Sequence, residues 1–163
     1  ICTYLDSLAG YGTEMKLEKV LKRYPDGRLD IKTRGLRIFR ISTFVNPVAG
    51  KLYSGGEVEF LENDSNIELQ LQHKYIFYLK EVLQHLDFPG EIPLDSTSFA
   101  FAHKIGLTLQ EELDLLMLTS ETDRIHFLLN HFMKILSVLK ATEKAKEKIR
   151  QNGHVKHLDP LNF

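Results

Sequence analysis

The chain changes character near residue 62, and this change limits the folds that it can adopt. Over residues 1–62, turn-forming residues recur at short intervals, and the segments between them are short and alternate apolar with polar side chains. Beyond residue 62, apolar residues recur at steps of three and four over longer segments. The first pattern is typical of paired β-strands and the second of amphipathic helices. The sequence therefore predicts an α+β protein with a β lobe at 1–62 and a helical lobe at 63–163.

The β lobe is organised around one turn. Pro25 fixes its φ near the value that a turn needs, the Asp26 side chain can bond its own backbone, and Gly27 tolerates positive φ. The following segments, 28–34 and 36–41, alternate apolar with charged residues, as half-buried strands do. We expect a third strand at 52–61, with the adjacent glycines 55 and 56 forming a bulge.

The segment before the turn gives conflicting signals. Its apolar residues, Leu17, Val20, Leu21 and Tyr24, follow the spacing of an amphipathic helix. A tight turn at 25–27, however, normally joins two strands. The spacing of the apolar residues favours a helix, whereas the turn that follows favours a strand.

The helical lobe is predicted to contain four helices, each with a capping residue near its start. They are expected at about 66–86, 95–103, 108–118 and 120–152, with the caps Ser65, Asp95, Thr108 and Ser120. Ser65 with Glu68, and Thr108 with Glu111, have the spacing of capping boxes. Gly106 is expected just past the second helix.

Composition excludes several classes of protein. The net charge of −1 gives no global attraction to nucleic acid or acidic lipid. No apolar segment approaches the ~20 residues of a membrane helix, so we expect no membrane span. The single cysteine, Cys2, cannot form an internal disulfide and is expected to be buried in a strand, which fits a reducing, cytoplasmic location. Residue 1 is Ile rather than Met, and we expect the natural chain to begin upstream.

The residues reveal no catalytic, cofactor or metal site. His154 and His157 form the closest histidine pair but lack further ligands at a suitable spacing, and His126 and His131 are five residues apart. The glycine pairs lack the pattern of a phosphate or dinucleotide loop. The basic segment 140–156 has a local charge of +4. Positive charge is favourable at the C-terminal end of a helix, and the segment lacks the interleaved aromatic residues that stack on nucleic-acid bases. We therefore favour the helix-end interpretation over a nucleic-acid contact.

Four arginines in the predicted strands are candidates for either packing or ligand contact: Arg28, Arg34, Arg37 and Arg40. Strand alternation places Arg37 and Phe39 on one face. We expect one arginine to lie against the core and to pair with a carboxylate of Asp30, Glu57 or Glu59.

The order of several short motifs resembles the Lon N-terminal domain family, and the resemblance covers nearly the whole chain. The matching motifs are Tyr11-Gly12-Thr13-Glu14, Leu17-Glu18-Lys19-Val20, the turn with its following strand from Pro25 to Ile31, the segment from Gly35 to Ile41, L-T-L-Q-E-E-L-D-L-L at 107–116, and Arg124 near the start of the last helix. The resemblance implies a PUA-like β pseudo-barrel followed by a helical lobe that ends in a long helix, with 13–24 as a strand.

The chain departs from the family pattern at both ends. The family's initial Pro-Leu-Phe-Pro-like strand and the following H-I-F-E-x-R-Y-like segment are absent, so the barrel is expected to be incomplete at its N-terminal side. Neither the ATPase nor the Ser-Lys protease of Lon is present, and we expect a stand-alone Lon-domain protein that is not an enzyme.

The resemblance implies a non-catalytic module that binds unfolded or peptide-like protein segments. Contacts are expected at Arg37, Phe39 and Tyr53. Two alternatives stay open: a PUA-like RNA-binding protein, and an accessory subunit or fragment of an ATP-dependent protease. We expect no cofactor, and the sequence does not indicate the oligomeric state.

Overall fold

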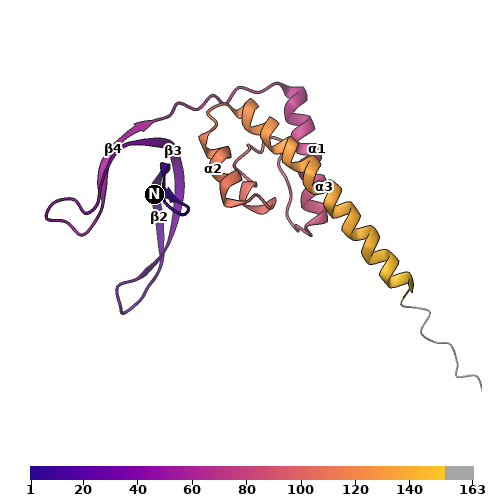
Figure 1. Cartoon of the computed structure of the whole chain (residues 1–163), viewed down its shortest axis with the longest axis horizontal. Coiled ribbons are helices and arrows are strands. Elements are labelled where there is room, and N and C mark those ends of the chain that lie inside the picture. Colours follow the sequence, from indigo (N-terminus) through magenta and orange to yellow (C-terminus); the bar gives the residue numbers. More distant parts are fainter. Residues whose placement is uncertain (153–163) are drawn as a thin grey trace, which may run out of the picture. The chain divides into compact units, whose positions relative to one another are not determined.

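A computed structural model describes residues 1–152 of the chain (Figure 1). By their internal contacts the residues divide into two compact units. The first, here called the strand unit, contains Ile1–Asn66 and Thr108–Glu121. The second, here called the helix unit, contains Ile67–Leu107 and the chain from Thr122 onward. The lobe boundary at residue 62 stays a prediction.

The strand unit is built on a curled antiparallel sheet of four strands in the order β1-β2-β3-β4 (Figure 1). The strands are β1 (Cys2–Tyr4), β2 (Leu8–Arg23), β3 (Leu29–Val45) and β4 (Gly55–Phe60). The predicted turn joins β2 to β3. There the Arg28 N–H bonds the Asp26 carboxylate at 3.1 Å, and Gly27 has a φ of 88°. The expected strand at 13–24 is confirmed.

Two irregularities explain why β2 looks helical in sequence. The pairing with β3 shifts between Leu17 and Lys19 and again between Val20 and Lys22, so one extra residue is accommodated each time. Each bulge lengthens the two-residue period of a strand to three. Leu17 and Val20 therefore fall on one face, three residues apart, although no helix is present.

The prediction for the third strand was partly wrong. β4 begins at Gly55, and the two glycines pair in regular register with Val45 and Phe44. The register shift lies on β3, between Ile41 and Thr43. A Cβ atom on residue 56 would collide with the backbone carbonyl of Thr43, so glycine is needed here for close approach of two strands.

The core of the helix unit forms around α1 (Leu69–His85) and α3 (Glu121–Asn152). Seven of its apolar side chains have no exposed surface, namely Tyr75, Leu79, Val82, Ile105, Ile125, Leu128 and Phe132. The rings of Tyr75 and Phe132 stack with centroids 5.9 Å apart and join the two helices. α3 runs beside α1 and continues past it (Figure 1).

One predicted capping box forms and the other does not. Thr108 caps α2 (Leu109–Met117), with reciprocal bonds to the backbone and side chain of Glu111. By contrast, α1 begins after Glu68, and neither Ser65 nor Glu68 makes the predicted box. The backbone at Asp64 is held in a bridge to Ser120, and the Asp64 carboxylate accepts a hydrogen bond from the Asn66 N–H at 2.9 Å.

The predicted helix at 95–103 is also wrong. Only a short 3-10 turn, η1 (Ala102–Lys104), forms there. The Gln72 side chain donates to the carbonyls of Leu94 and Ser96, and the Tyr75 hydroxyl donates to that of Thr97. Side chains of α1 thus use the carbonyl groups that a helix would need for its own hydrogen bonds.

Candidate protein-interaction surface

Two of the three predicted contact residues form one cluster on the sheet. The ring of Phe39 meets that of Phe60 edge-on, with centroids 6.2 Å apart. The Arg37 guanidinium lies 3.7 Å from the centroid of the Phe60 ring, and its Nε donates to Glu14 at 2.7 Å. Phe39 is 8% exposed, whereas Phe60 is 40% exposed. Phe60, which the sequence did not single out, therefore presents more of this cluster to solvent.

The third predicted residue, Tyr53, lies elsewhere. It belongs to the loop before β4 rather than to the strand, and it is 62% exposed. Its carbonyl accepts a hydrogen bond from the Val48 N–H at 3.0 Å. The length of β4 separates Tyr53 from Phe60, so the structure does not bring Tyr53 into the Arg37 cluster.

The four arginines of the strands all pair with carboxylates, but none is buried. Arg28 pairs with Asp26, Arg34 with Glu18, Arg37 with Glu14, and Arg40 with Glu59, at distances of 2.6 to 2.7 Å. Their side chains remain more than half exposed. Glu59 was an expected partner; an arginine packed against the core was not found among these four.

Hydrogen bonding shifts the ionisation of these pairs. The hydrogen bond from Arg37 lowers the pKa of Glu14, and the same bond raises the pKa of Arg37. Lys32, with Arg34 beside it, lowers the pKa of Glu18. The lowered pKa values keep Glu14 and Glu18 ionised at neutral pH, although exposed pairs of this kind contribute little net stability.

The β2–β3 hairpin, residues 16–34, is here called the arm (Figure 1). Its large aliphatic side chains are 45% to 60% exposed, namely Leu17, Leu21, Leu29 and Ile31. Its backbone is fully paired between the two strands apart from the bulges. The arm thus combines an ordered backbone with apolar surface that no described residue covers.

The buried arginine of the chain is Arg124, in α3. It is 1% exposed, its Nε donates to the Ser98 hydroxyl at 3.0 Å, and its guanidinium lies 4.7 Å from the centroid of the Phe99 ring. The sequence carried a signal for this: an arginine directly before Ile125 within a wide apolar stripe. Arg124 ties the 94–101 segment to α3 and has a packing role.

The remaining reactive candidates form no site. Cys2 lies in β1 as predicted but is exposed, because β1 is a three-residue edge strand with one neighbour. His131 is buried with a ring nitrogen 2.9 Å from the Ile105 carbonyl, whereas His126 is exposed. His154 and His157 lie outside the described residues. Within residues 1–152, no group of three metal-binding side chains gathers, and no helix is long and apolar enough to cross a membrane.

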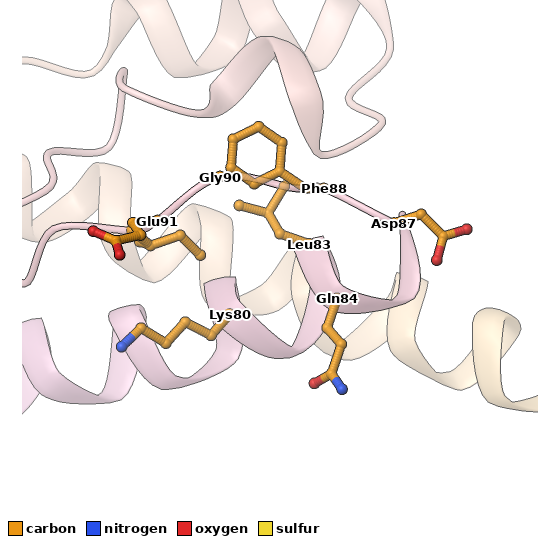
Figure 2. A pocket seen from close by; sticks show the side chains of 8 residues that line it. Lys80, Leu83, Gln84, Asp87, Phe88, Gly90 and Glu91 are labelled. Atoms are coloured by element: carbon orange, nitrogen blue, oxygen red, sulfur yellow. The ribbon is translucent and has the colours of Figure 1, made fainter.

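The helix unit carries an open groove of about 680 Å³ at the end of α1 (Figure 2). It is lined by Lys80, Leu83, Gln84, Asp87, Phe88, Gly90, Glu91 and Ile92. Figure 2 shows Phe88 and Leu83 close together, with Lys80 and Glu91 extending to one side and Asp87 to the other. The rim carries both signs of charge, so the lining does not select a particular ion.

Comparison with known proteins identifies solved structures with a similar fold. No protein-family model and no curated protein matches the chain. Among solved structures, a Lon N-terminal domain protein from Xanthomonas campestris is 28% identical, with a TM-score of 0.59, over 79% of this chain and 72% of that one. The N-terminal domain of a Mycobacterium avium complex Lon protease is 18% identical, with a TM-score of 0.57, over 80% of this chain and 74% of that one.

These similarities define the class. A curled antiparallel sheet followed by a helical part is the architecture shared with both solved structures. The chain is a Lon N-terminal-domain-like protein, as its sequence motifs predicted.

Proposed function

We propose that this chain is a non-catalytic module that binds unfolded or peptide-like segments of other proteins. The likeness to Lon N-terminal domains supports a role of this kind. The observation that carries the proposal is the arm, whose exposed aliphatic side chains lie on a hydrogen-bonded two-stranded backbone. Apolar contacts of this type suit client segments that expose side chains normally buried in a folded protein.

The predicted contact residues have different roles in this proposal. Tyr53 is an exposed aromatic anchor of the kind enriched at binding surfaces. Arg37 and Phe60 form a stacked pair that can flank a bound chain. Phe39 lies beneath and supports the Phe60 ring. A cytoplasmic location and the absence of catalysis remain part of the proposal.

A fluorescence experiment tests binding directly. The chain contains no tryptophan, so a tryptophan placed in a ten-residue apolar peptide reports binding without protein background. We expect its anisotropy to rise on titration with the protein. The double variant Leu17→Ser/Ile31→Ser should weaken binding, because it removes apolar surface from the arm.

Met133→Ser/Val138→Ser is a matched control, because these side chains are 57% and 63% exposed in the helix unit. An equal loss in the control would show that the arm is not the binding surface. Failure of every unfolded probe to bind would overturn the function. Salt-sensitive binding of a labelled RNA in place of peptide would favour the RNA-binding alternative, and co-purification with an ATPase would favour the protease-subunit alternative.

A further inference from the structure

The groove at the end of α1 has a preformed apolar wall (Figure 2). The ring of Phe88 meets that of Phe101 edge-on, with centroids 5.8 Å apart, and Lys104 Nζ lies 4.4 Å from the Phe88 centroid. A Cβ atom at Gly90 would lie 2.5 Å from the Phe88 ring, so the absence of a side chain there makes room for the ring. Leu83, which is 1% exposed, lies close to it. The wall is therefore in place before any ligand binds, as in most ligand sites.

The chain that borders the groove leaves backbone groups unused. Residues 90–92 belong to neither a helix nor a strand, and within residues 1–152 their backbone N–H and C=O groups make no hydrogen bond. Just beyond them the segment is anchored, because the Gln72 side chain donates to the carbonyls of Leu94 and Ser96. Backbone groups of this kind beside an apolar wall can pair with an extended segment of another protein.

Asp87, which also lines the groove, breaks two rules of local stability. It follows the C-cap residue Leu86 with a φ of 53°, a conformation that glycine adopts most easily after a helix. Its carboxylate also lies at the C-terminal end of α1, where the helix dipole favours a cation. Local stability therefore does not explain the carboxylate, and departures of this kind concentrate at functional positions.

The charges of the groove are unevenly placed. Lys80, Asp87 and Glu91 make no ion pair or side-chain hydrogen bond within the part of the chain that the structure describes. Lys80 and Glu91 extend to one side, and Asp87 extends to the other (Figure 2). One end thus carries both signs of charge, whereas the other carries a carboxylate and the negative end of the helix dipole. The complementary group at the Asp87 end is a cation.

We propose that this groove is a second binding surface, which takes an extended protein segment with a large aliphatic residue two positions from a lysine or arginine. Side chains two positions apart lie on the same face of an extended chain. The aliphatic side chain packs on Leu83 and Phe88, the cation meets Asp87, and the backbone pairs with residues 90–92. The site lies in the helix unit and is distinct from the arm.

Three seven-residue peptides with a terminal fluorescein test the preference. The first contains Leu-Ser-Lys between glycines and serines, the second replaces its lysine with glutamate, and the third replaces its leucine with serine. At low salt we expect the first to bind about tenfold more tightly than the second, because an attractive pair replaces a repulsive one. The third should bind several-fold more weakly than the first. Equal anisotropy titrations for the first two peptides would overturn the proposal.

NMR of the ¹⁵N-labelled protein locates the site. Addition of the Leu-Ser-Lys peptide should shift amide signals of residues 80–92, with the largest changes at 90–92, where new backbone hydrogen bonds form. Shifts confined to the arm, residues 16–34, would leave the proposed function standing and reject the groove as a binding surface.

Substitution of Asp87 separates binding from stability. Asp87→Gly removes both the unfavourable φ and the misplaced charge, so it should raise the midpoint of thermal unfolding by a few degrees. The same change should weaken binding of the Leu-Ser-Lys peptide about tenfold. A purely structural role predicts the opposite, a lower midpoint with unchanged binding, and that result would contradict the proposal.

Charge reversal provides the reciprocal test. Asp87→Lys should reverse the preference in favour of the glutamate peptide. The matched control Glu147→Lys makes the same change of net charge at an exposed position of α3 and should keep the original preference. A reversal by both variants would assign the effect to net charge and not to the groove.

Two further outcomes bear on the occupant of the groove. Leu17→Ser/Ile31→Ser, which tests the arm, should leave binding of the Leu-Ser-Lys peptide unchanged; an equal loss would place this peptide on the arm and remove the second surface. An unlabelled peptide of residues 153–163 serves as competitor. If it displaced the Leu-Ser-Lys peptide at lower concentration than the unlabelled Leu-Ser-Lys peptide does, the occupant would be this chain's own end, and the foreign segment would be rejected.

Discussion

The helix unit and the strand unit distribute their buried side chains differently. The helix unit buries seven apolar side chains completely. In the four strands, among residues whose burial is described, only Gly12 and Phe39 are buried. Side-chain packing therefore dominates the helix unit, whereas the sheet is held mainly by the backbone hydrogen bonds between its strands. The difference teaches that a paired backbone can order strands whose side chains are left largely exposed.

The largest expected effect tests the packed side of this comparison. Phe132→Ala removes a ring with no exposed surface that stacks on Tyr75. We expect a loss of about 3–5 kcal/mol in the free energy of unfolding, from the lost transfer energy and the cavity left behind. Chemical denaturation followed by circular dichroism measures it. Met133→Ala, at a 57% exposed neighbour, should stay within about 0.5 kcal/mol; similar losses for both would contradict a packed core here.

A second prediction concerns the buried contact between Gly12 and Phe39 in the sheet. A Cβ atom at Gly12 would collide with the Phe39 ring and lie 2.5 Å from the backbone oxygen of Ile1. We expect Gly12→Ala to destabilise the strand unit by about 1–3 kcal/mol through overpacking. Hydrogen exchange of peptides from β1, β2 and β3 should report it, with little change in α1.

Gly35→Ala is the control for this substitution. Its Cβ would approach the methyl group of Thr13 at 3.2 Å, a side chain that can move. An effect as large as that of Gly12→Ala would show that any side chain disturbs β2 and β3, and that the Phe39 contact is not special.

A smaller effect is expected at the capping box. Thr108→Ala removes the hydroxyl that accepts the Glu111 N–H at 3.2 Å. The cost should be about 1 kcal/mol, typical of a lost N-cap. Faster hydrogen exchange should appear in α2, which groups with the strands by contacts, before it appears in α1. The control Thr142→Ala, at an exposed position of α3, should leave the free energy of unfolding nearly unchanged. If Thr108→Ala accelerated hydrogen exchange equally in α1 and α2, the distinction between the two units would be contradicted.

The smallest effect is a pH dependence of the strand unit. Because the Arg37 hydrogen bond lowers the folded-state pKa of Glu14, the unfolded state binds more protons in this range and stability rises with pH. The contribution is present above the unfolded glutamate pKa of about 4.3 and is lost as pH falls through the lowered folded value.

Glu14→Gln should therefore lose less stability than the parent between about pH 5 and pH 3. Chemical denaturation at several pH values measures how steeply the free energy of unfolding depends on pH. Arg37→Gln and the double variant Glu14→Gln/Arg37→Gln complete a double-mutant cycle. Identical slopes for parent and Glu14→Gln would show that the pair is not coupled to folding.

Sequence patterns predicted the elements whose determinants are local. The turn at 25–27 and the Thr108 capping box depend on residues a few positions apart, and both formed. The two strands predicted at 28–34 and 36–41 are one continuous strand, β3, which runs through Gly35. For 13–24 the family resemblance was needed, because the bulges imitate helical spacing.

What the sequence missed depends on distant partners. The 95–103 segment lost its helix to hydrogen bonds from Gln72 and Tyr75, more than twenty residues away. Phe60 entered the Arg37 cluster through strand register, which alternation within one strand cannot reveal.

α3 extends well past its last pairings with α1. Lys140 bonds Glu81 at 2.6 Å and Glu143 meets His85 at 2.8 Å, and residues 144–150 are all exposed. A helix without a neighbour frays from its end. Trypsin should therefore shorten the protein in steps at Arg150, Lys148, Lys146 and Lys144, and then slow at Lys140. A protease-resistant fragment ending there would be the natural choice for crystallisation or for attachment to a sensor surface.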